Sequence, residues 1–248
     1  MKGHDPSGGC TNGVISQAKL DERYPAVGAA RERARGIRQR ILRWWRKAAR
    51  HYPWRENGRT AYEILVAEML LKRTTASAAA RLYQDFLRQF PSVEALDKAP
   101  EHQVEEALAT VGLQRQRARG FKGMARYLSQ VTGGEVPNDL GALCRVPQVG
   151  KYASAAVASF AMGIPVAVLD SNVERILRRV FMHTLPAPPG PSLLRILADM
   201  LLPPRAHREF NLAMLDLGAG VCRYVRPRCA VCPIRTLCDY GATEVRRP

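Results

Sequence analysis

The sequence lacks any apolar run as long as the roughly 20 residues that a membrane-spanning helix needs. The longest candidate, residues 153–169, is interrupted by Ser, Gly and Pro. The first residues also lack the apolar segment of a secretory signal peptide, so we expect no secretion. The hydrophobic fraction of 46% is too high for a disordered chain. These features predict a globular protein of the cytoplasm and exclude the membrane and secreted classes.

Acidic residues are few, and this shortage gives the chain a strong positive charge. There are 22 Asp and Glu against 38 Lys and Arg, for a formal net charge of +16. Most of the basic residues are Arg, whose guanidinium binds phosphate through two hydrogen bonds and stacks on bases. A GC-rich genome would explain the choice of Arg over Lys, but not the surplus of charge. The charge therefore predicts a polyanionic partner, most simply nucleic acid.

Strand patterns are almost absent, and only Pro165–Leu169 resembles a short strand. Residues 1–29 contain much Gly and Pro without any periodicity, which predicts a flexible leader. Apolar residues elsewhere recur at three- and four-residue spacing, which indicates helices and an all-α protein. The helices that we expect are 30–50, 61–72, 76–90, 92–98, 101–110, 115–131, 139–144, 151–162, 171–181, 192–201 and 205–217.

Two of the expected helices begin with capping signals. Asn138 or Asp139 can accept a hydrogen bond from the free backbone N–H groups of the helix at 139–144. The run Ser171-Asn172-Val173-Glu174 matches a capping box, in which Ser and Glu side chains satisfy the first N–H groups. We therefore expect sharp helix starts at both places.

Four of the six cysteines gather near the C-terminus as C-x6-C-x2-C-x5-C, at Cys222, Cys229, Cys232 and Cys238. Four thiolates so close in sequence can bind one metal centre, with zinc as the default and an iron–sulfur cluster as the alternative. Arg223, Arg226, Arg228 and Arg235 lie among them. The motif therefore predicts either a purely structural metal site or a rigid loop that also contacts phosphates, and the two roles are compatible.

A second motif, Val146-Pro147-Gln148-Val149-Gly150-Lys151, lies between two expected helices. A tight hairpin there would direct backbone N–H groups outward at a helix start and form an anion site, with Lys151 adding charge. Pro and Gly are common at any corner between two helices, so the pattern alone is weak. It is compatible with both a phosphate contact and a plain structural turn.

Two carboxylates and one tyrosine are candidates for the chemistry. Glu68 lies on the apolar face of the helix at 61–72, where burial is expected to raise its pKa and fit it for proton transfer. A buried Glu paired with an Arg is the structural alternative. Asp170 precedes the helix at 171–181, so it is either a helix cap or a carboxylate at a cleft rim. Tyr152 is either a core residue or part of a pocket wall.

Together, these features resemble the helix-hairpin-helix DNA glycosylases of the endonuclease III superfamily. In that family the hairpin is followed by a catalytic Asp and then by a C-x6-C-x2-C-x5-C motif that holds a 4Fe–4S cluster. This chain has Val146–Lys151, Asp170 and the four cysteines in the same order and at the same spacing. The resemblance covers about residues 35–240 and implies a 4Fe–4S cluster, not zinc, as the cofactor.

Three positions indicate a branch within that superfamily. The segments Pro53-Trp54-Arg55 and Glu68-Met69-Leu70-Leu71 are similar to adenine glycosylases and to thymine/uracil mismatch glycosylases, while endonuclease III lacks the Glu. Lys72-Arg73-Thr74-Thr75 resembles the mismatch enzymes, since adenine enzymes usually have Gln-Gln-Thr there. Tyr152 also resembles the mismatch enzymes, because bifunctional lyases have Lys and adenine enzymes usually Ser at that position.

The chain departs from the family pattern at Gln148, where the hairpin normally has Gly. A side chain there is expected to change the path of the hairpin or one phosphate contact. The sequence ends shortly after Cys238, so we also expect no counterpart of the C-terminal domain with which adenine enzymes recognise 8-oxoguanine.

The resemblance implies a two-lobed helix-hairpin-helix fold with a C-terminal cluster loop. A six-helix barrel that includes the hairpin is expected at residues 58–165, and the cluster lobe at 30–57 together with 166–241. A monomer is expected to bind double-stranded DNA between the lobes, in the nucleoid if the source is a prokaryote.

The activity that the resemblance implies is excision of thymine or uracil mispaired with guanine, without AP-lyase activity. Asp170 is expected to stabilise the oxocarbenium-like sugar or to activate water, Glu68 to contact the base or water, and Tyr152 to line the pocket. The expected DNA contacts come from the hairpin residues Val146, Gln148, Val149, Gly150 and Lys151, from Arg73, Gln114 and Arg115 at the orphan guanine, and from Arg226 and Arg228 on phosphates.

Three other functions fit parts of the same pattern. An adenine glycosylase acting on A·G or A·8-oxoG is the alternative enzyme. A non-catalytic DNA-binding iron–sulfur protein would keep the fold, but the presence of both Glu68 and Asp170 argues against it. An electron carrier would explain the cysteines, but neither Asp170 nor the charge.

Overall fold

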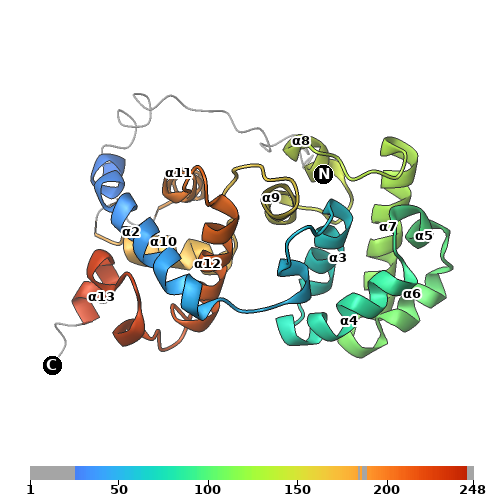
Figure 1. The fold of residues 1–248 in the computed structure, drawn as a ribbon, viewed down its shortest axis with the longest axis horizontal. Helices are drawn as coiled ribbons and strands as arrows, with labels where there is room; N and C mark the ends of the chain where they lie inside the picture. The colour runs from blue at the N-terminus through green and yellow to red at the C-terminus, as the bar shows by residue number, and fades with distance from the viewer. Residues whose placement is uncertain (1–25, 184, 186–188, 245–248) are drawn as a thin grey trace, which may run out of the picture. The chain divides into compact units, whose positions relative to one another are not determined.

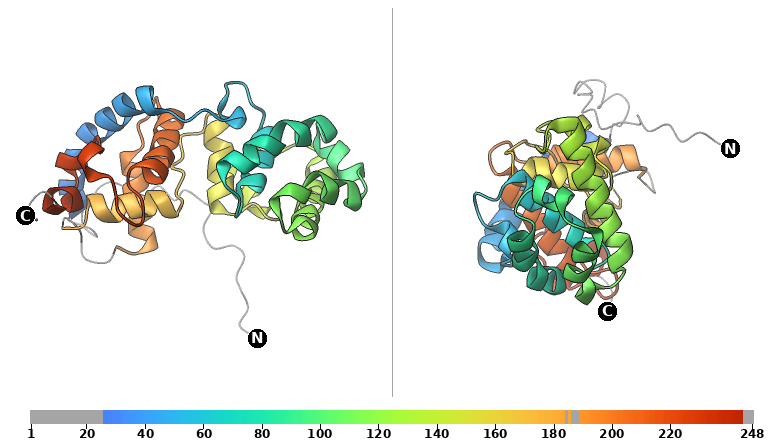
Figure 2. Two further views of the ribbon diagram at one scale, coloured as in Figure 1. Left: turned by 90° about the horizontal axis from the view of Figure 1, so that it is seen from below. Right: turned by 90° about the vertical axis from the view of Figure 1, so that its right-hand side faces the viewer.

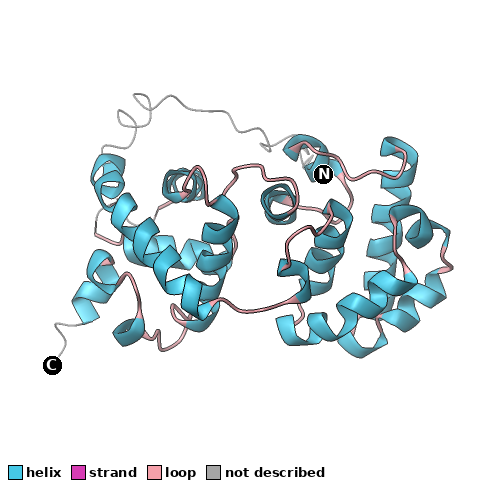
Figure 3. Ribbon diagram, in the orientation of Figure 1, coloured by secondary structure: helices cyan, strands magenta, loops and turns pink. Residues whose placement is uncertain are grey.

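The structure, a computed structural model, describes residues 26–183, 185 and 189–244. Of the flexible leader expected at 1–29, residues 1–25 lie outside the described residues. The other four, residues 26–29, belong to helix α2 (Ala26–Ala48). Every regular element of the described residues is helical (Figure 3), which confirms the all-α prediction. None of the described helices is long and apolar enough to cross a membrane.

The described chain divides into two compact units (Figure 1), one formed by residues 51–164 and the other by 26–50 with the residues from 165 onward. The elements of the first unit are η1 (Pro53–Arg55), α3 (Ala61–Leu71), α4 (Ala76–Gln89), α5 (Val93–Lys98), α6 (Glu101–Ala107), η2 (Ala109–Val111), α7 (Gln114–Thr132), α8 (Leu140–Arg145) and α9 (Lys151–Phe160). Helix α3 packs on α4 and α9, α7 packs on α5 and α6, and α8 packs on α9.

Helix α3 is the centre of the first unit. Every residue from Ile64 to Leu70 is buried, as expected for a helix that is apolar on all sides. Its N-terminus has a complete capping box, in which Thr60 N donates to Glu63 Oε2 (2.7 Å) and Glu63 N donates to Thr60 Oγ1 (3.2 Å). The sequence pattern thus fixes where the helix that carries Glu68 begins.

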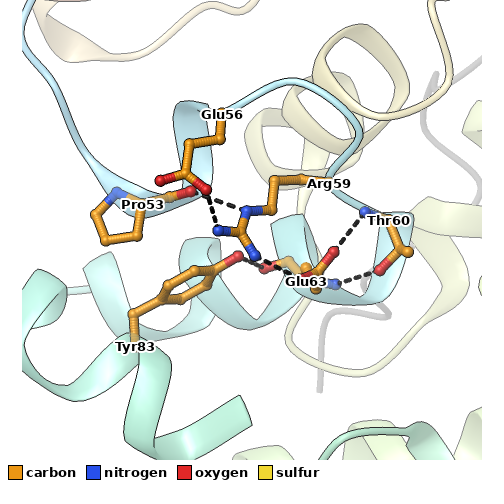
Figure 4. A network of polar contacts seen from close by, with 6 residues as sticks. All are labelled: Pro53, Glu56, Arg59, Thr60, Glu63 and Tyr83. Atoms are coloured by element: carbon orange, nitrogen blue, oxygen red, sulfur yellow. Dashed lines mark hydrogen bonds and ion pairs between the residues drawn. The ribbon is translucent and has the colours of Figure 1, made fainter.

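A polar network ties the segment before α3 to this unit (Figure 4). Arg59 donates from Nε to the carbonyl of Pro53 (2.9 Å) and from Nη1 to Glu63 Oε1 (2.8 Å), and it also pairs with Glu56. Tyr83 on α4 donates to the Glu63 carbonyl (3.2 Å). Residues 51–57, which we expected in the cluster lobe, therefore group with the first unit.

The second unit is built on α2, α10 (Ser171–Val180), α11 (Pro191–Leu201) and α12 (His207–Gly220), which lie side by side (Figures 1 and 2). Val27, Ala30, Ala34, Ile37 and Ile41 recur along one face of α2 and are buried in the core of this unit. The cysteine segment follows as η3 (Cys229–Val231), η4 (Arg235–Leu237) and α13 (Asp239–Glu244), the last of which the sequence did not predict.

The helix predictions are confirmed within a few residues, but the strand expected at Pro165–Leu169 is wrong. This segment is extended without pairing to another strand. The buried amide of Asn211 on α12 takes the place of a neighbouring strand, since Nδ2 donates to the Val166 carbonyl (2.8 Å) and Oδ1 accepts from Val168 N (3.0 Å). The apolar segment can therefore be buried without a sheet, and it leads directly to Asp170.

Candidate functional site

Glu68 is buried on α3, with 6% of its surface exposed. One turn later, Lys72 has its pKa lowered mainly by burial, while the Glu68 carboxylate opposes that shift and Arg117 adds to it. Lys72 Nζ donates to the backbone carbonyl of Gln148 in the hairpin. The end of α3 and the hairpin are thereby joined within the first unit.

The hairpin between α8 and α9 turns tightly at residues 146–150. Val146 and Val149 are buried, and Val149 N donates to the Val146 carbonyl (3.0 Å). Gln148, Gly150 and Lys151 are exposed. The arrangement anchors the turn by its two valines and leaves its polar residues on the surface.

Gln148 keeps the left-handed backbone that a glycine adopts easily, with φ of 69°. This conformation costs a non-glycine residue about 1–2 kcal/mol. Its side chain packs over Gly120 of α7, where an added Cβ would lie 3.4 Å from Gln148 Cγ. The turn thus remains tight with Gln at this position, and the Gln148 side chain lies beside Gly120.

Arg73 and Leu113 are two exposed residues that also have left-handed backbones, each with φ of 53°. Leu113 exposes 52% of its surface, and the sequence analysis did not identify it. Its only sequence signal is its place after Gly112, since an apolar residue normally indicates core. Both residues border a cavity of about 160 Å³, which is lined by Met69, Lys72, Arg73, Leu113, Gln116, Arg117, Gly120, Phe121 and Gln148.

The remaining predicted residues of the first unit lie at two helix starts. Gln114 and Arg115 are exposed in the first turn of α7, and Arg115 Nε lies 3.7 Å from Glu105 Oε2. Tyr152 is half-buried in the first turn of α9. Because α9 packs on α3, the helices that carry Tyr152 and Glu68 are neighbours.

Asp170 belongs to the second unit, where it is the N-cap of α10. Its Oδ1 accepts from Val173 N (2.7 Å) and its Oδ2 accepts from Asn172 Nδ2 (2.7 Å). The capping box expected from Ser171 is therefore wrong, because Asp170 itself takes the capping position. At 139–144, in contrast, Asp139 is confirmed as the cap, with Oδ1 accepting from Ala142 N (2.8 Å).

Hydrogen bonds continue from Asp170 to the first cysteine. Arg175 Nη2 donates to Asn172 Oδ1 (2.9 Å) and to the Gly218 carbonyl (2.8 Å), while its Nε donates to the Cys222 carbonyl (2.8 Å). The half-buried carboxylate of Asp170 and the cysteine segment are thus connected within one unit through two side chains.

The four cysteines line a common cavity together with Ile176, Val221 and Ile234. Burial raises the pKa of both Cys232 and Cys238 to about 11. Arg179 Nη1 lies 3.4 Å from Cys222 Sγ, and Gly241 N donates to Cys238 Sγ (3.5 Å). Thiols in apolar surroundings with N–H donors directed at sulfur fit the donor set of an iron–sulfur cluster. Among the described residues, no three His, Cys, Asp or Glu converge into a site for a single metal ion.

The segment between Cys222 and Cys229 is open to solvent. Arg226, with φ of 51°, and Arg228 are exposed, as is Tyr224 with 81% of its surface. Arg179 Nη1 and Nη2 donate to the carbonyls of Arg223 (2.7 Å) and Tyr224 (3.1 Å). The loop is therefore held at its base while its basic side chains point outward.

The family model of the HhH-GPD superfamily of base excision DNA repair proteins matches residues 66–190. The thymine/uracil-DNA glycosylase of Methanothermobacter thermautotrophicus is 35% identical over 81% of this chain and 90% of its own. The adenine DNA glycosylase of Mycobacterium tuberculosis is 36% identical over 78% of this chain and 64% of its own. A solved thermostable thymine-DNA glycosylase superimposes with a TM-score of 0.81 at 33% identity, over 88% of this chain and 99% of that one. The chain belongs to the HhH-GPD superfamily, and its resemblance to that family is confirmed.

Proposed function

We propose that the protein is a monofunctional DNA glycosylase that hydrolyses the N-glycosidic bond of thymine or uracil mispaired with guanine in double-stranded DNA. The observation that carries this proposal is the carboxylate of Asp170, which is half-buried at a helix start with both oxygens accepting hydrogen bonds. A carboxylate held in this way can stabilise a positive charge that develops on the sugar.

The reaction begins with extrusion of the mispaired nucleotide, which costs least when the base is poorly paired. Asp170 then stabilises the oxocarbenium-like sugar or activates the attacking water. Glu68 contacts the base or a water, and the neighbouring helix supplies Tyr152 to the pocket wall. A tyrosine cannot form a Schiff base with the sugar, so the product is an intact abasic site.

The proposed DNA contacts are of two kinds, to backbone phosphates and to bases. The exposed hairpin residues Gln148, Gly150 and Lys151, held by Val146 and Val149, bind a backbone phosphate, and Arg226 with Arg228 bind others. Arg73, Gln114 and Arg115 contact the orphan guanine. Leu113 inserts between base steps, as exposed apolar side chains do in other DNA-kinking proteins.

The four cysteines hold one 4Fe–4S cluster in this proposal. The cluster is structural and orients the loop that carries Arg226 and Arg228. Purified protein is expected to contain iron and acid-labile sulfide in equal amounts. Zinc without iron would overturn the assignment.

One excision assay tests the function. Duplexes with T·G, U·G, A·G and A·8-oxoG are incubated with the enzyme and then treated with alkali to cut at abasic sites. Excision from T·G or U·G alone is the expected result. Excision of adenine would favour the adenine glycosylase, which one curated relative at 36% identity makes the second candidate. Tight binding without excision from any duplex would leave a non-catalytic DNA-binding protein.

A further inference from the structure

We propose that Arg117 is a positioning residue that holds Arg73 and Leu113 as one rigid edge for insertion into DNA. The proposal rests on the proposed function, because it concerns how the enzyme fills the gap left by the flipped nucleotide. Its physical basis lies wholly within the first unit, in the contacts of one guanidinium.

Arg117 reaches from α7 to both loops that carry the left-handed residues. On one side, Nη2 donates to the Lys72 carbonyl (2.6 Å) and to Thr74 Oγ1 (2.5 Å), the residues directly before and after Arg73. On the other side, Nε donates to the carbonyl of Gly112 (3.0 Å), directly before Leu113. One side chain therefore brackets Arg73 and fixes the start of the Leu113 turn.

The same guanidinium also supplies hydrogen-bond donors to carbonyls in the last turn of α3. The last carbonyls of a helix have no partner within it. Arg117 Nη1 lies 3.5 Å from the carbonyls of both Met69 and Leu70, which are in the last turn of α3. Lysine cannot replace this arrangement, because its ammonium is a single point of charge without the planar fork of arginine.

Left-handed backbones at Arg73 and Leu113 require outside support. Such a conformation is unfavourable for a residue with a Cβ and persists where the surroundings over-determine it. Both residues nonetheless adopt it with the same φ of 53°, on two different loops. Arg117 contacts both loops, so its loss should free both residues together.

Rigidity matters here because an inserted side chain must displace stacked bases. A preformed edge does not have to be ordered during binding, whereas a mobile one does. Arg117 itself contacts protein groups and is only partly exposed. We therefore expect it to affect base flipping and excision more than the affinity for undamaged duplex DNA.

The first experiment measures backbone protection without DNA. Amide hydrogen exchange is compared for wild type, Arg117→Ala, Arg117→Lys and the matched control Arg119→Ala. Arg119 lies on the same helix with 75% of its side chain exposed and its Nε 3.4 Å from Glu101. Faster exchange at residues 72–75 and 111–114 is expected in both Arg117 variants but not in the control. Unchanged exchange at these residues would overturn the proposal, whatever the enzyme's substrate.

The second experiment measures flipping by the fluorescence of 2-aminopurine beside the mismatch, together with single-turnover excision. Arg117→Ala should reduce excision about 100-fold, as small misplacements of a distant positioning group can do. The excision rate of Arg117→Lys should lie between those of wild type and Arg117→Ala. The Kd of both Arg117 variants for matched duplex should change no more than that of Arg119→Ala. Equal losses of matched-duplex affinity and of excision would identify Arg117 as an ordinary DNA contact and reject the positioning role.

A double-mutant cycle with Leu113→Ala separates positioning from general loss of structure. If Arg117 acts through Leu113, then Arg117→Ala should cost much less in the Leu113→Ala background than in wild type. Full additivity, or a loss that follows melting temperature alone, would reject the proposal. If wild type excises no base at all, the proposed function fails, while the exchange experiment still decides the role of Arg117.

Discussion

Arg175 donates a 2.8 Å hydrogen bond to the backbone carbonyl of Cys222 while its other nitrogen holds Asn172, the neighbour of the Asp170 carboxylate. The carboxylate proposed for catalysis and the cysteine loop proposed for the cluster are therefore two ends of one hydrogen-bonded chain. We therefore expect a shift of the loop at Cys222 to alter the position of Asn172 and with it the hydrogen bond to Asp170.

Asp170→Asn should keep binding to a T·G duplex but lose excision. The amide can still cap α10, yet it carries no charge to stabilise the developing cation. The loss of such a group costs about 3 kcal/mol or more, which corresponds to roughly a hundredfold in rate. Single-turnover excision and binding to the same duplex provide the measurement. A variant that excises within a few-fold of wild type would remove Asp170 from the mechanism.

Asn211→Leu should destabilise the protein by about 2–4 kcal/mol, because it leaves the Val166 carbonyl and the Val168 N–H buried without their partner. Urea unfolding measures the change, with the exposed Gln39→Ala on α2 as the control. Excision should fall as well, because this segment leads into Asp170. A destabilisation no larger than that of Gln39→Ala, about 0.5 kcal/mol at most, would contradict the assigned role of Asn211.

The sequence predicted most helices, because periodicity and capping residues are local signals. The capping box of Thr60 and Glu63 at the start of α3 is a signal of the same local kind that the sequence analysis did not use. For α10 the sequence offered two caps, Asp170 and the capping box from Ser171, because both residues are good capping residues. Only the backbone shows that Asp170 is the one that accepts from Val173 N.

Features that depend on distant segments were not predictable. Asn211 replaces a strand partner from another helix, so the segment at 165–169 gave a false strand signal. Leu113 gave the signal of a core residue, yet it is exposed and has a left-handed backbone. Arg117 contacts the nearby Gly112, but it also reaches Lys72 and Thr74, and that part of its role has no local pattern.

The stability of the first unit should depend on pH through Glu63. Burial works to raise its pKa, but hydrogen bonds from Thr60 and Arg59 outweigh burial and hold the pKa below its ordinary value of 4.5. The contribution of this carboxylate is therefore present above pH 4.5 and is lost as the pH falls through the lowered pKa. The free energy of unfolding of wild type minus that of Glu63→Gln should shrink over that range. A difference independent of pH would show that the capping box acts without its charge.

Binding to DNA should weaken steeply with salt, and the cysteine loop should contribute to that dependence. Each phosphate contact adds about 0.9 to the slope of log affinity against log salt. Arg226→Ala and Arg228→Ala should each reduce the slope by about this amount if their exposed side chains bind phosphate. Arg88→Ala serves as the control, since Arg88 on α4 pairs with Asp85. Slopes equal to that of the control in both variants would leave the loop a structural element without a DNA contact.

Tyr152 determines whether the enzyme can cut the sugar after removing the base. A lyase needs an unprotonated lysine amine at the pocket wall, and this chain has Lys151 one residue earlier. One residue rotates a helical side chain by about 100°. Lys151 is accordingly exposed while Tyr152 is half-buried, so the two side chains face different surroundings. Wild type should therefore leave intact abasic DNA that is cut only after alkali, and borohydride should trap no protein–DNA adduct.

Tyr152→Lys should introduce an amine at that wall and form a borohydride-trapped adduct in low yield. Lys151→Ala in the same background is the control: it should weaken binding to DNA, but with enzyme in saturating excess the trapped fraction should stay the same if the amine at residue 152 forms the adduct. Efficient trapping by wild type would mean that Lys151 or another amine reaches the sugar, and the enzyme would be a lyase. If Tyr152→Lys excises the base but never traps, Tyr152 lies away from the sugar, and the monofunctional character must have another cause.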